Sequence, residues 1–275
     1  MTRLRSLAFN AAFLLWSVAM HLATLPFVFG PGRAIYLMGL IWIRGDLLLL
    51  RLICGLHYRI EGLEHFPKAP CIIAAKHQSM WETIAFCHIF DRPIFVLKQE
   101  LTRIPFYGWY LRRMGMIAID RSGGASAMRQ MVAETKDRLA RGKHVIIFPE
   151  GTRSDPGKKR PYHPGVAALY KQVGVPVLPV ALDSGLFWPG RTMRQSPGRI
   201  TVRLLPPLQP GLERRDFMAR LEESIEGASR ELLERAGRPV DNPVNESQGL
   251  EAAGLPGESG RTSPERSVDP ARGGA

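Results

Sequence analysis

His77 and Glu82 lie five positions apart, directly after a short apolar run, and side chains of these types could form an acid/base pair. The run at residues 71–75 is bounded by Pro70 and by polar residues, a pattern typical of a buried strand. In α/β folds the chemistry gathers in the crevice at the carboxyl ends of the strands. We therefore expect His77 to take a proton from a substrate hydroxyl while Glu82 holds its ring. Ser79 is near enough to be a nucleophile, but a hydroxyl there more often begins a helix, which is the interpretation we favour.

Further polar residues follow three other predicted strands: Lys98 after 93–97, Arg121 after 116–119, and Glu150, Gly151, Thr152 and Arg153 after 145–148. Parallel strands end at one edge of a sheet, so these residues should gather beside His77. Arginine forks bind phosphate oxygens in pairs, and lysine adds a compact charge. Gly151 allows backbone N–H groups to approach an anion. The pattern predicts a phosphate site beside a reacting hydroxyl, in which Glu150 orients Arg153 or accepts a hydrogen bond from a substrate hydroxyl.

The elements that must position these residues alternate along the chain. Strands are predicted at 58–60, 71–75, 93–97, 116–119, 145–148, 175–182 and 199–205, and helices at 80–90, 100–114, 125–140, 166–173 and 212–233. Strands alternating with helices indicate an α/β fold with a largely parallel central sheet flanked by helices on both faces. The strand at 58–60 is expected at an edge of the sheet.

The N-terminal region predicts association with a membrane. Two arginines precede an apolar stretch at 7–29, and a span needs about 20 such residues. A retained segment is favoured over a cleaved signal peptide, because the stretch is long and no clear cleavage site follows. A second stretch at 34–56 carries Arg44 and Asp46 near its middle, so it is expected to lie in the interface. We expect residues 1–56 to form a membrane-associated helical hairpin that turns at 30–32 and enters and leaves by one face.

The rest of the chain divides into a catalytic body at 57–237 and a tail at 238–275. The tail is rich in Gly, Pro, Ser and Glu and is expected to be disordered. The formal net charge is +12; residues 241–275 hold six acids and three arginines, which leaves +15 on the body. Such a body favours an anionic partner: nucleic acid, a membrane face or a phosphorylated substrate. Nucleic acid is the least favoured, since the sequence has no aromatic stacking platform or recognisable motif.

The three cysteines, Cys54, Cys71 and Cys87, lie in or beside apolar runs. An odd number in such positions argues against a disulfide framework and for a reducing compartment. Their spacing does not suggest zinc, and no metal ligand set is predicted.

Four blocks in order, at 77–82, 98–121, 148–154 and 175–180, resemble the glycerolipid acyltransferase family over about residues 70–183. The resemblance implies a glycerol-3-phosphate acyltransferase-like fold. It also implies transfer of an acyl group to the sn-2 hydroxyl of 1-acyl-glycerol-3-phosphate (lysophosphatidic acid), giving phosphatidic acid in phospholipid biosynthesis. The co-substrate would be acyl-CoA or an acyl-carrier-protein thioester, with no cofactor. Two residues depart from the usual family pattern: Glu82 stands where Asp is usual, and Lys76 where Asn is common.

By this resemblance His77 is the general base and Glu82 orients its ring, while Arg121, Arg153 and Lys98 hold the phosphate. The partners would be membrane lipids, and the location the cytoplasmic face of a bacterial inner membrane. Two alternatives stay open. One is an acyltransferase acting on another lyso-lipid, such as a lyso-ornithine lipid; the other is a non-catalytic basic protein that binds membrane surfaces. The joint presence of His77, Glu82 and both arginines speaks against the second.

Overall fold

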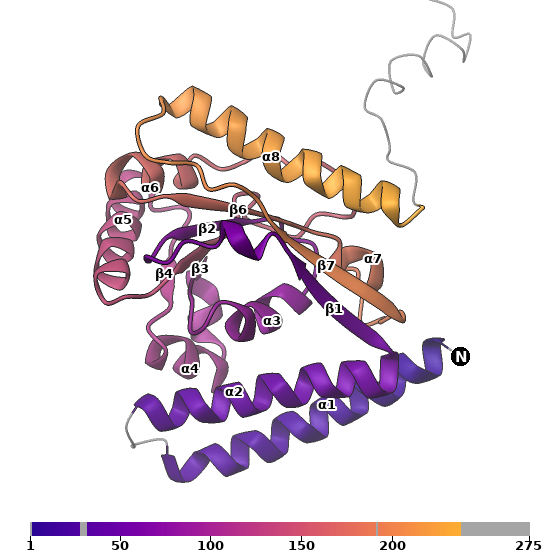
Figure 1. Ribbon diagram of the computed structural model, residues 1–275. Coiled ribbons are helices and arrows are strands. Elements are labelled where there is room, and N and C mark those ends of the chain that lie inside the picture. Colours follow the sequence, from indigo (N-terminus) through magenta and orange to yellow (C-terminus); the bar gives the residue numbers. More distant parts are fainter. Residues whose placement is uncertain (1, 28–31, 191, 238–275) are drawn as a thin grey trace, which may run out of the picture. The chain divides into compact units, whose positions relative to one another are not determined.

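A mostly parallel sheet is the centre of the computed structural model, which describes residues 2–27, 32–190 and 192–237 (Figure 1). Within these residues the sheet has seven strands in the order β1-β7-β6-β2-β5-β3-β4. The strands are β1 (Leu56–Glu61), β2 (Ile72–Ala75), β3 (Ile94–Lys98), β4 (Ile117–Ile119), β5 (Val145–Ile147), β6 (Val177–Leu182) and β7 (Gly198–Leu204). Neighbours run parallel except β6 and β7, which are antiparallel. The predicted fold class and the edge position of the first strand are confirmed.

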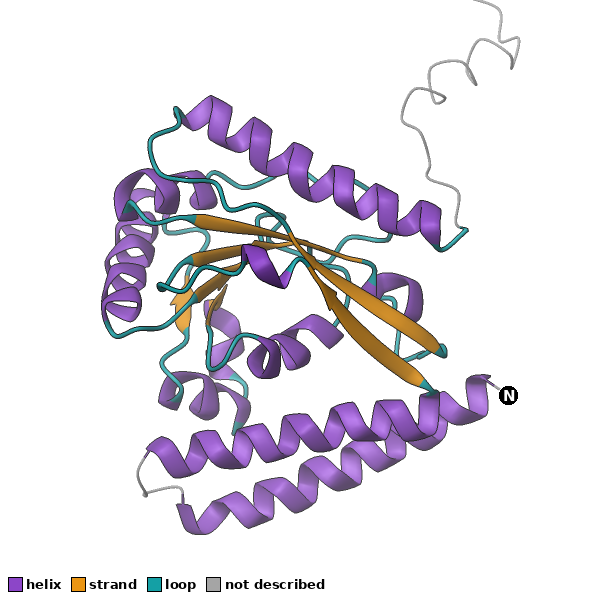
Figure 2. Ribbon diagram, viewed as in Figure 1, coloured by secondary structure: helices purple, strands orange, loops and turns teal. Residues whose placement is uncertain are grey.

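Helices cover both faces of the sheet (Figure 2). The described helices of the body are α3 (Trp81–Ile89), α4 (Tyr107–Arg113), α5 (Gly124–Ala140), α6 (Gly165–Val173), α7 (Ser184–Phe187) and α8 (Arg214–Arg235). Alternate residues of a strand point to opposite faces. In β2, Ile73 and Ala75 pack with α3, whereas Ile72 and Ala74 pack with α5, α6 and α8. All four are fully buried, as expected for a central parallel strand.

The segment predicted as one helix at 100–114 is two elements. A 3₁₀ helix covers Gln99–Arg103, and α4 begins at Tyr107. Pro105 lies between them, and its ring has no N–H to continue a helical ladder. Two short elements were not predicted: the 3₁₀ turn Leu63–His65 and the one-turn helix α7. Both are too short to show a hydrophobic period.

Two helices, α1 (Thr2–Thr24) and α2 (Gly32–Leu49), lie side by side at the N-terminus (Figure 1). Trp16 Nε1 donates to the Trp42 carbonyl at 3.0 Å, and Trp42 Nε1 donates to Ser17 Oγ at 3.0 Å. A Cβ on Gly45 would lie 2.4 Å from the Trp16 ring, so only glycine permits this approach. The predicted helical pair is present, although most of its predicted turn, like the predicted disordered tail, lies outside the described residues.

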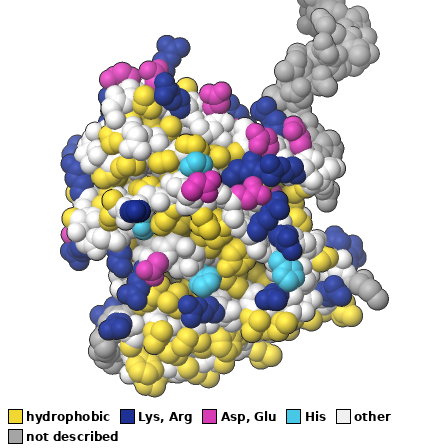
Figure 3. Space-filling view, viewed as in Figure 1, with side chains coloured by type: hydrophobic (Ala, Val, Ile, Leu, Met, Phe, Trp, Pro, Cys, Tyr) yellow, Lys and Arg dark blue, Asp and Glu magenta, His cyan; other side chains and the backbone are white. Residues whose placement is uncertain are grey.

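Helix α1 has one face in the core and one face exposed. Phe9 is 1% exposed and meets the Trp188 ring edge-on at 5.7 Å. The opposite face of α1 exposes apolar side chains: Leu4, Leu7, Leu14, Leu15, Val18 and Leu22. Within the described residues, Thr2–Phe27 is the one helix whose length and composition would allow it to cross a membrane. Hydrophobic side chains accordingly dominate the surface of the helix pair at the bottom of Figure 3.

Candidate active site

The predicted pair forms at the carboxyl end of β2. His77 follows the strand and Glu82 lies in the first turn of α3, where His77 Nδ1 is 2.9 Å from Glu82 Oε1. The same oxygen accepts the backbone N–H groups of Gln78 and Ser79, both at 2.6 Å. The other oxygen, Oε2, accepts from the Ser184 hydroxyl at 2.8 Å. Glu82 is fully buried, so the donors from Gln78, Ser79 and Ser184 fix the carboxylate, and the carboxylate in turn orients the imidazole.

Ser79 has the helix-start role that the sequence favours. Its hydroxyl accepts from the N–H of Trp81, the first residue of α3, at 3.1 Å. The Ser79 residue is fully buried. The hydroxyl therefore satisfies one of the unpaired donors at the start of the helix.

The His77 ring is held on its face as well as at its edge. It stacks on Phe148 with ring centroids 4.1 Å apart and an interplanar angle of 15°. A neutral imidazole that donates from Nδ1 has an acceptor at Nε2. Because Nδ1 faces Glu82, Nε2 is the nitrogen that can receive a substrate proton. The His77 side chain is 12% exposed, so access to the ring is restricted.

The loop after β5 clamps the backbone of His77. His77 N–H donates to Glu150 Oε2 at 3.1 Å, and Ser154 N–H donates to the His77 carbonyl at 2.8 Å. The other oxygen of Glu150, Oε1, lies 2.7 Å from Lys76 Nζ, and the Glu150 side chain is 1% exposed. Glu150 was expected to orient Arg153 or meet substrate as part of the phosphate site. The structure instead directs both of its oxygens toward the segment that carries His77, because Lys76 supplies a buried cation there.

Lys76 stood out in the sequence only as a departure from the family pattern, and its role in the structure was not predicted. Its side chain is 2% exposed, and Nζ also lies 2.8 Å from Glu226 Oε1 of α8. The Tyr162 hydroxyl donates to the same Glu226 oxygen at 2.9 Å. The place of Lys76 directly after a wholly apolar strand was the signal that it is buried, and buried lysines require a partner. Ser184 was also missed, and nothing in its local sequence marks it.

The predicted phosphate-binding cations lie at the ends of β3, β4 and β5. Arg121 Nη1 donates to the Gly151 carbonyl at 2.6 Å, and Arg153 Nη1 donates to the Gly190 carbonyl at 3.0 Å. Gly190 packs on the Gln78 backbone, so Arg153 lies close to the His77 loop. Each bond uses one of the five N–H donors of a guanidinium. The structure thus brings both arginines to the loops around His77.

Lys98, Gly151 and Thr152 lie at the same edge of the sheet. Lys98 ends β3 opposite Ile119 of β4, and its Nζ lies 2.9 Å from Glu100 Oε1. Its side chain is 51% exposed. Gly151 has a φ of +65°, which favours glycine, and Thr152 beside it is exposed.

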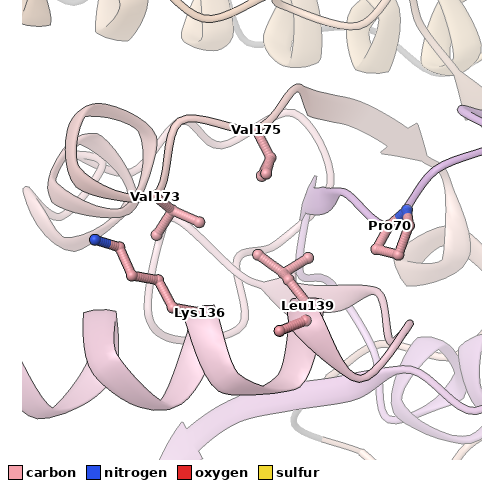
Figure 4. Close-up of a pocket in the computed structure, with 6 residues that line it drawn as sticks. Pro70, Lys136, Leu139, Val173 and Val175 are labelled. Carbon is pink, nitrogen blue, oxygen red and sulfur yellow. The ribbon is translucent and has the colours of Figure 1, made fainter.

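A depression of about 350 Å³ lies at the opposite edge of the sheet (Figure 4). Pro70 and Val175 line it just before β2 and β6 begin, together with Lys136, Leu139 and Val173. His77 follows the other end of β2. This depression is therefore separate from the candidate active site.

Comparison with known proteins places the chain among acyltransferase sequences. A family model described as Acyltransferase matches residues 57–183. A 1-acyl-sn-glycerol-3-phosphate acyltransferase of Pseudomonas aeruginosa is 38% identical over 185 residues, which cover 67% of this chain and 72% of the relative. A lyso-ornithine lipid O-acyltransferase of the same organism is 28% identical over 196 residues, covering 64% of this chain and 74% of that protein.

A solved structure shares the fold. The crystal structure of the 1-acyl-sn-glycerophosphate acyltransferase of Thermotoga maritima superimposes with a TM-score of 0.67 at 23% sequence identity. The match covers 84% of this chain and 98% of that chain. The similarity includes most of the described residues.

Proposed function

Because the chain belongs to the acyltransferase family, we propose that it transfers an acyl group from an acyl-CoA or acyl-carrier-protein thioester to the sn-2 hydroxyl of 1-acyl-glycerol-3-phosphate. The product would be phosphatidic acid. The observation that carries the proposal is the hydrogen bond between His77 Nδ1 and the buried Glu82, with two arginines on the neighbouring loops. A base next to cations suits an acceptor that carries both a hydroxyl and a phosphate.

In this mechanism His77 Nε2 takes the proton of the acceptor hydroxyl as its oxygen attacks the thioester carbonyl. Glu82 stabilises the imidazolium that forms and keeps the ring in its orientation. The new ester C–O bond forms, the C–S bond breaks, and the imidazolium returns the proton to the departing thiolate. The Ser79 hydroxyl accepts from the helix backbone and is fully buried, which supports direct transfer without a covalent serine intermediate.

Phosphate recognition is assigned to Arg121 and Arg153, with Lys98 and the Gly151–Thr152 backbone beside them. The two guanidiniums lie on loops that also contact the His77 segment. Charge-assisted hydrogen bonds to phosphate are roughly twice as strong as neutral ones, and arginine can form them in pairs. This arrangement would hold the sn-3 phosphate while the neighbouring hydroxyl meets His77.

The proposed acceptor is a lipid, so the enzyme should act at a membrane. The exposed apolar face of α1 supports membrane association. The body carries +15 without residues 241–275, and each well-placed cation contributes about 1 kcal/mol toward an anionic surface. We assign the enzyme to the cytoplasmic face of a bacterial inner membrane, attached through residues 1–56.

The test compares three acceptors on purified protein: lysophosphatidic acid, the same molecule without its phosphate, and a lyso-ornithine lipid. We expect the first to be preferred. One relative of this chain is a lyso-ornithine lipid O-acyltransferase. A preference for the lyso-ornithine lipid would therefore overturn the acceptor assignment.

The matched variant is Arg153→Ala, which should raise KM for the phosphorylated acceptor by about 10- to 100-fold, since a hydrogen bond to a charged group contributes about 1.5–3 kcal/mol. Arg141→Ala is the control: Arg141 is exposed at the end of α5 and pairs with Asp137. An unchanged KM in Arg153→Ala would remove Arg153 from the phosphate site.

A further inference from the structure

The turn between the 3₁₀ helix and α4 has an unusual backbone. The N–H of Tyr107 donates to the carbonyl of Pro105, two residues earlier, at 2.6 Å. Between them Phe106 has φ +60° and ψ −56°. These angles and the i to i+2 bond define a γ-turn of the rare, strained form. A bulky residue in this conformation persists only where the surroundings impose it, and such strain collects at functional positions.

The strained turn does not bury the Phe106 side chain. Phe106 is 68% exposed, and Ile104 and Tyr107 on either side of the turn are each 46% exposed. Arg103 and Arg112, which flank this segment, are exposed as well. The chain therefore holds an aromatic ring outward, between aliphatic and cationic neighbours, at a conformational cost.

The turn is continuous with the exposed apolar face of α1. The His21 ring of α1 meets the Phe106 ring edge-on at 6.5 Å and the Tyr110 ring at 5.4 Å. Leu22 and Leu25, which follow His21, are exposed. Figure 1 shows α4 directly beside the helix pair. The turn and the end of α1 thus form one apolar surface.

We propose that residues 104–107 insert into the lipid bilayer beside α1, with Phe106 as the anchor. Aromatic rings are enriched at the membrane interface, and cations beside them meet the headgroups. We assign the bilayer as the partner of this surface, because the surface continues an apolar helix face and is flanked by arginines. The inference deepens the proposed function, on which it rests for the lipid nature of the acceptor.

The position of the turn links the membrane surface to the active site. Tyr107 follows Phe106 in the turn. Burial, and to a smaller extent the Cys87 thiol, raise the pKa of Tyr107, while the charge of Arg153 acts in the opposite direction. Phe106 and Tyr107 are adjacent, so the exposed Phe106 ring is next in the chain to a residue on which the charge of Arg153 acts. An acceptor whose chain stays in the bilayer beside Phe106 would have its headgroup next to the phosphate-binding arginines.

The first test places an environment-sensitive fluorophore on Phe106→Cys in a Cys87→Ser background, since Cys54 and Cys71 are buried. Vesicles of phosphatidylcholine and phosphatidylglycerol should shift the emission to the blue, and spin-labelled lipids should quench it. The control is the same label on Leu63→Cys, a residue 60% exposed on the 3₁₀ turn after β1, which should stay in water. No shift at position 106 overturns the proposal. A shift caused only by the thioester donor or its carrier protein also overturns it.

The second test is kinetic and uses Phe106→Ser and Phe106→Trp. For lysophosphatidic acid in vesicles, Phe106→Ser should raise the apparent KM about tenfold, and Phe106→Trp should retain wild-type behaviour. With a short-chain acceptor dissolved below its micelle concentration, all three proteins should have the same kcat. An equal loss on both acceptors in Phe106→Ser would show a role in folding or chemistry instead. Because the fluorescence shift needs no turnover, it can succeed even if the proposed acceptor is wrong.

Discussion

Lys76→Met removes the cation that two carboxylates share next to His77 in the chain. Lys76 Nζ lies 2.7 Å from Glu150 and 2.8 Å from Glu226. The side chains of Lys76 and Glu150 are 2% and 1% exposed, and that of Glu226 is 14% exposed. Methionine fills a similar volume without charge, so the substitution isolates the electrostatic contribution.

The expected loss is large, because the partners cannot be hydrated in place. Breaking a buried ion pair by removing one member costs about 3–5 kcal/mol. We therefore expect the free energy of unfolding to fall by about 3–5 kcal/mol. Glu150 also accepts the His77 N–H at 3.1 Å, so its displacement should lower kcat. A hydrogen bond to a charged group contributes about 1.5–3 kcal/mol, which corresponds to a decrease of about 10- to 100-fold.

The assay is denaturant unfolding in detergent together with acyl transfer. Lys171→Met is the matched control, because Lys171 pairs with Glu213 at 3.0 Å on the surface; it should change stability by less than about 1 kcal/mol. Adding Glu226→Gln to Lys76→Met should recover stability, with a coupling of about 1–3 kcal/mol. A Lys76→Met protein within about 1 kcal/mol of wild type, or a double variant with no coupling, would refute the assignment of a buried ion cluster.

Two further predictions concern residues around the pair. Ser184→Ala removes one hydrogen-bond donor from buried Glu82 and should lower kcat about tenfold, with KM unchanged. Ser184→Thr keeps the hydroxyl and should retain activity. Equal kcat values for the two variants would contradict a role of the Ser184 hydroxyl in positioning Glu82. Burial raises the pKa of Asp183 to about 6, despite a hydrogen bond from Thr201 N–H. The folded state then holds a proton that the unfolded state releases, so stability falls as pH rises from about 4 to about 6, by at most about 3 kcal/mol. The Asp183→Asn variant should lose this pH dependence when melting temperatures are measured at pH 4.5 and 7. If the melting temperature of the variant changes with pH as much as that of wild type, the assignment to Asp183 is refuted.

The sheet and the contact between His77 and Glu82 were predictable because local patterns encode them. Short apolar runs bounded by polar residues indicated buried strands, and β2 is fully buried. Parallel strands end at one edge, so His77 and the loop with Arg153 could be placed together before any coordinates. His77 and Glu82 are close in sequence, and their contact depends on one strand and one helix turn.

The support around the pair depends on contacts distant in sequence, which patterns do not encode. Glu226 is 150 residues from Lys76, and Ser184 is 102 residues from Glu82. The role of Glu150 was missed for the same reason, since it depends on where Lys76 directs its side chain. The γ-turn at Phe106 could not be predicted, because non-glycine residues rarely adopt positive φ.

The most direct test of the account is acyl transfer from a thioester donor to lysophosphatidic acid by His77→Ala, measured together with vesicle co-sedimentation. The exposed face of α1 is unchanged in this variant, so binding to vesicles should match wild type. Transfer should fall by at least about 10²-fold, the contribution typical of a positioned general base. Transfer near the wild-type rate would contradict the assignment of His77 as the base.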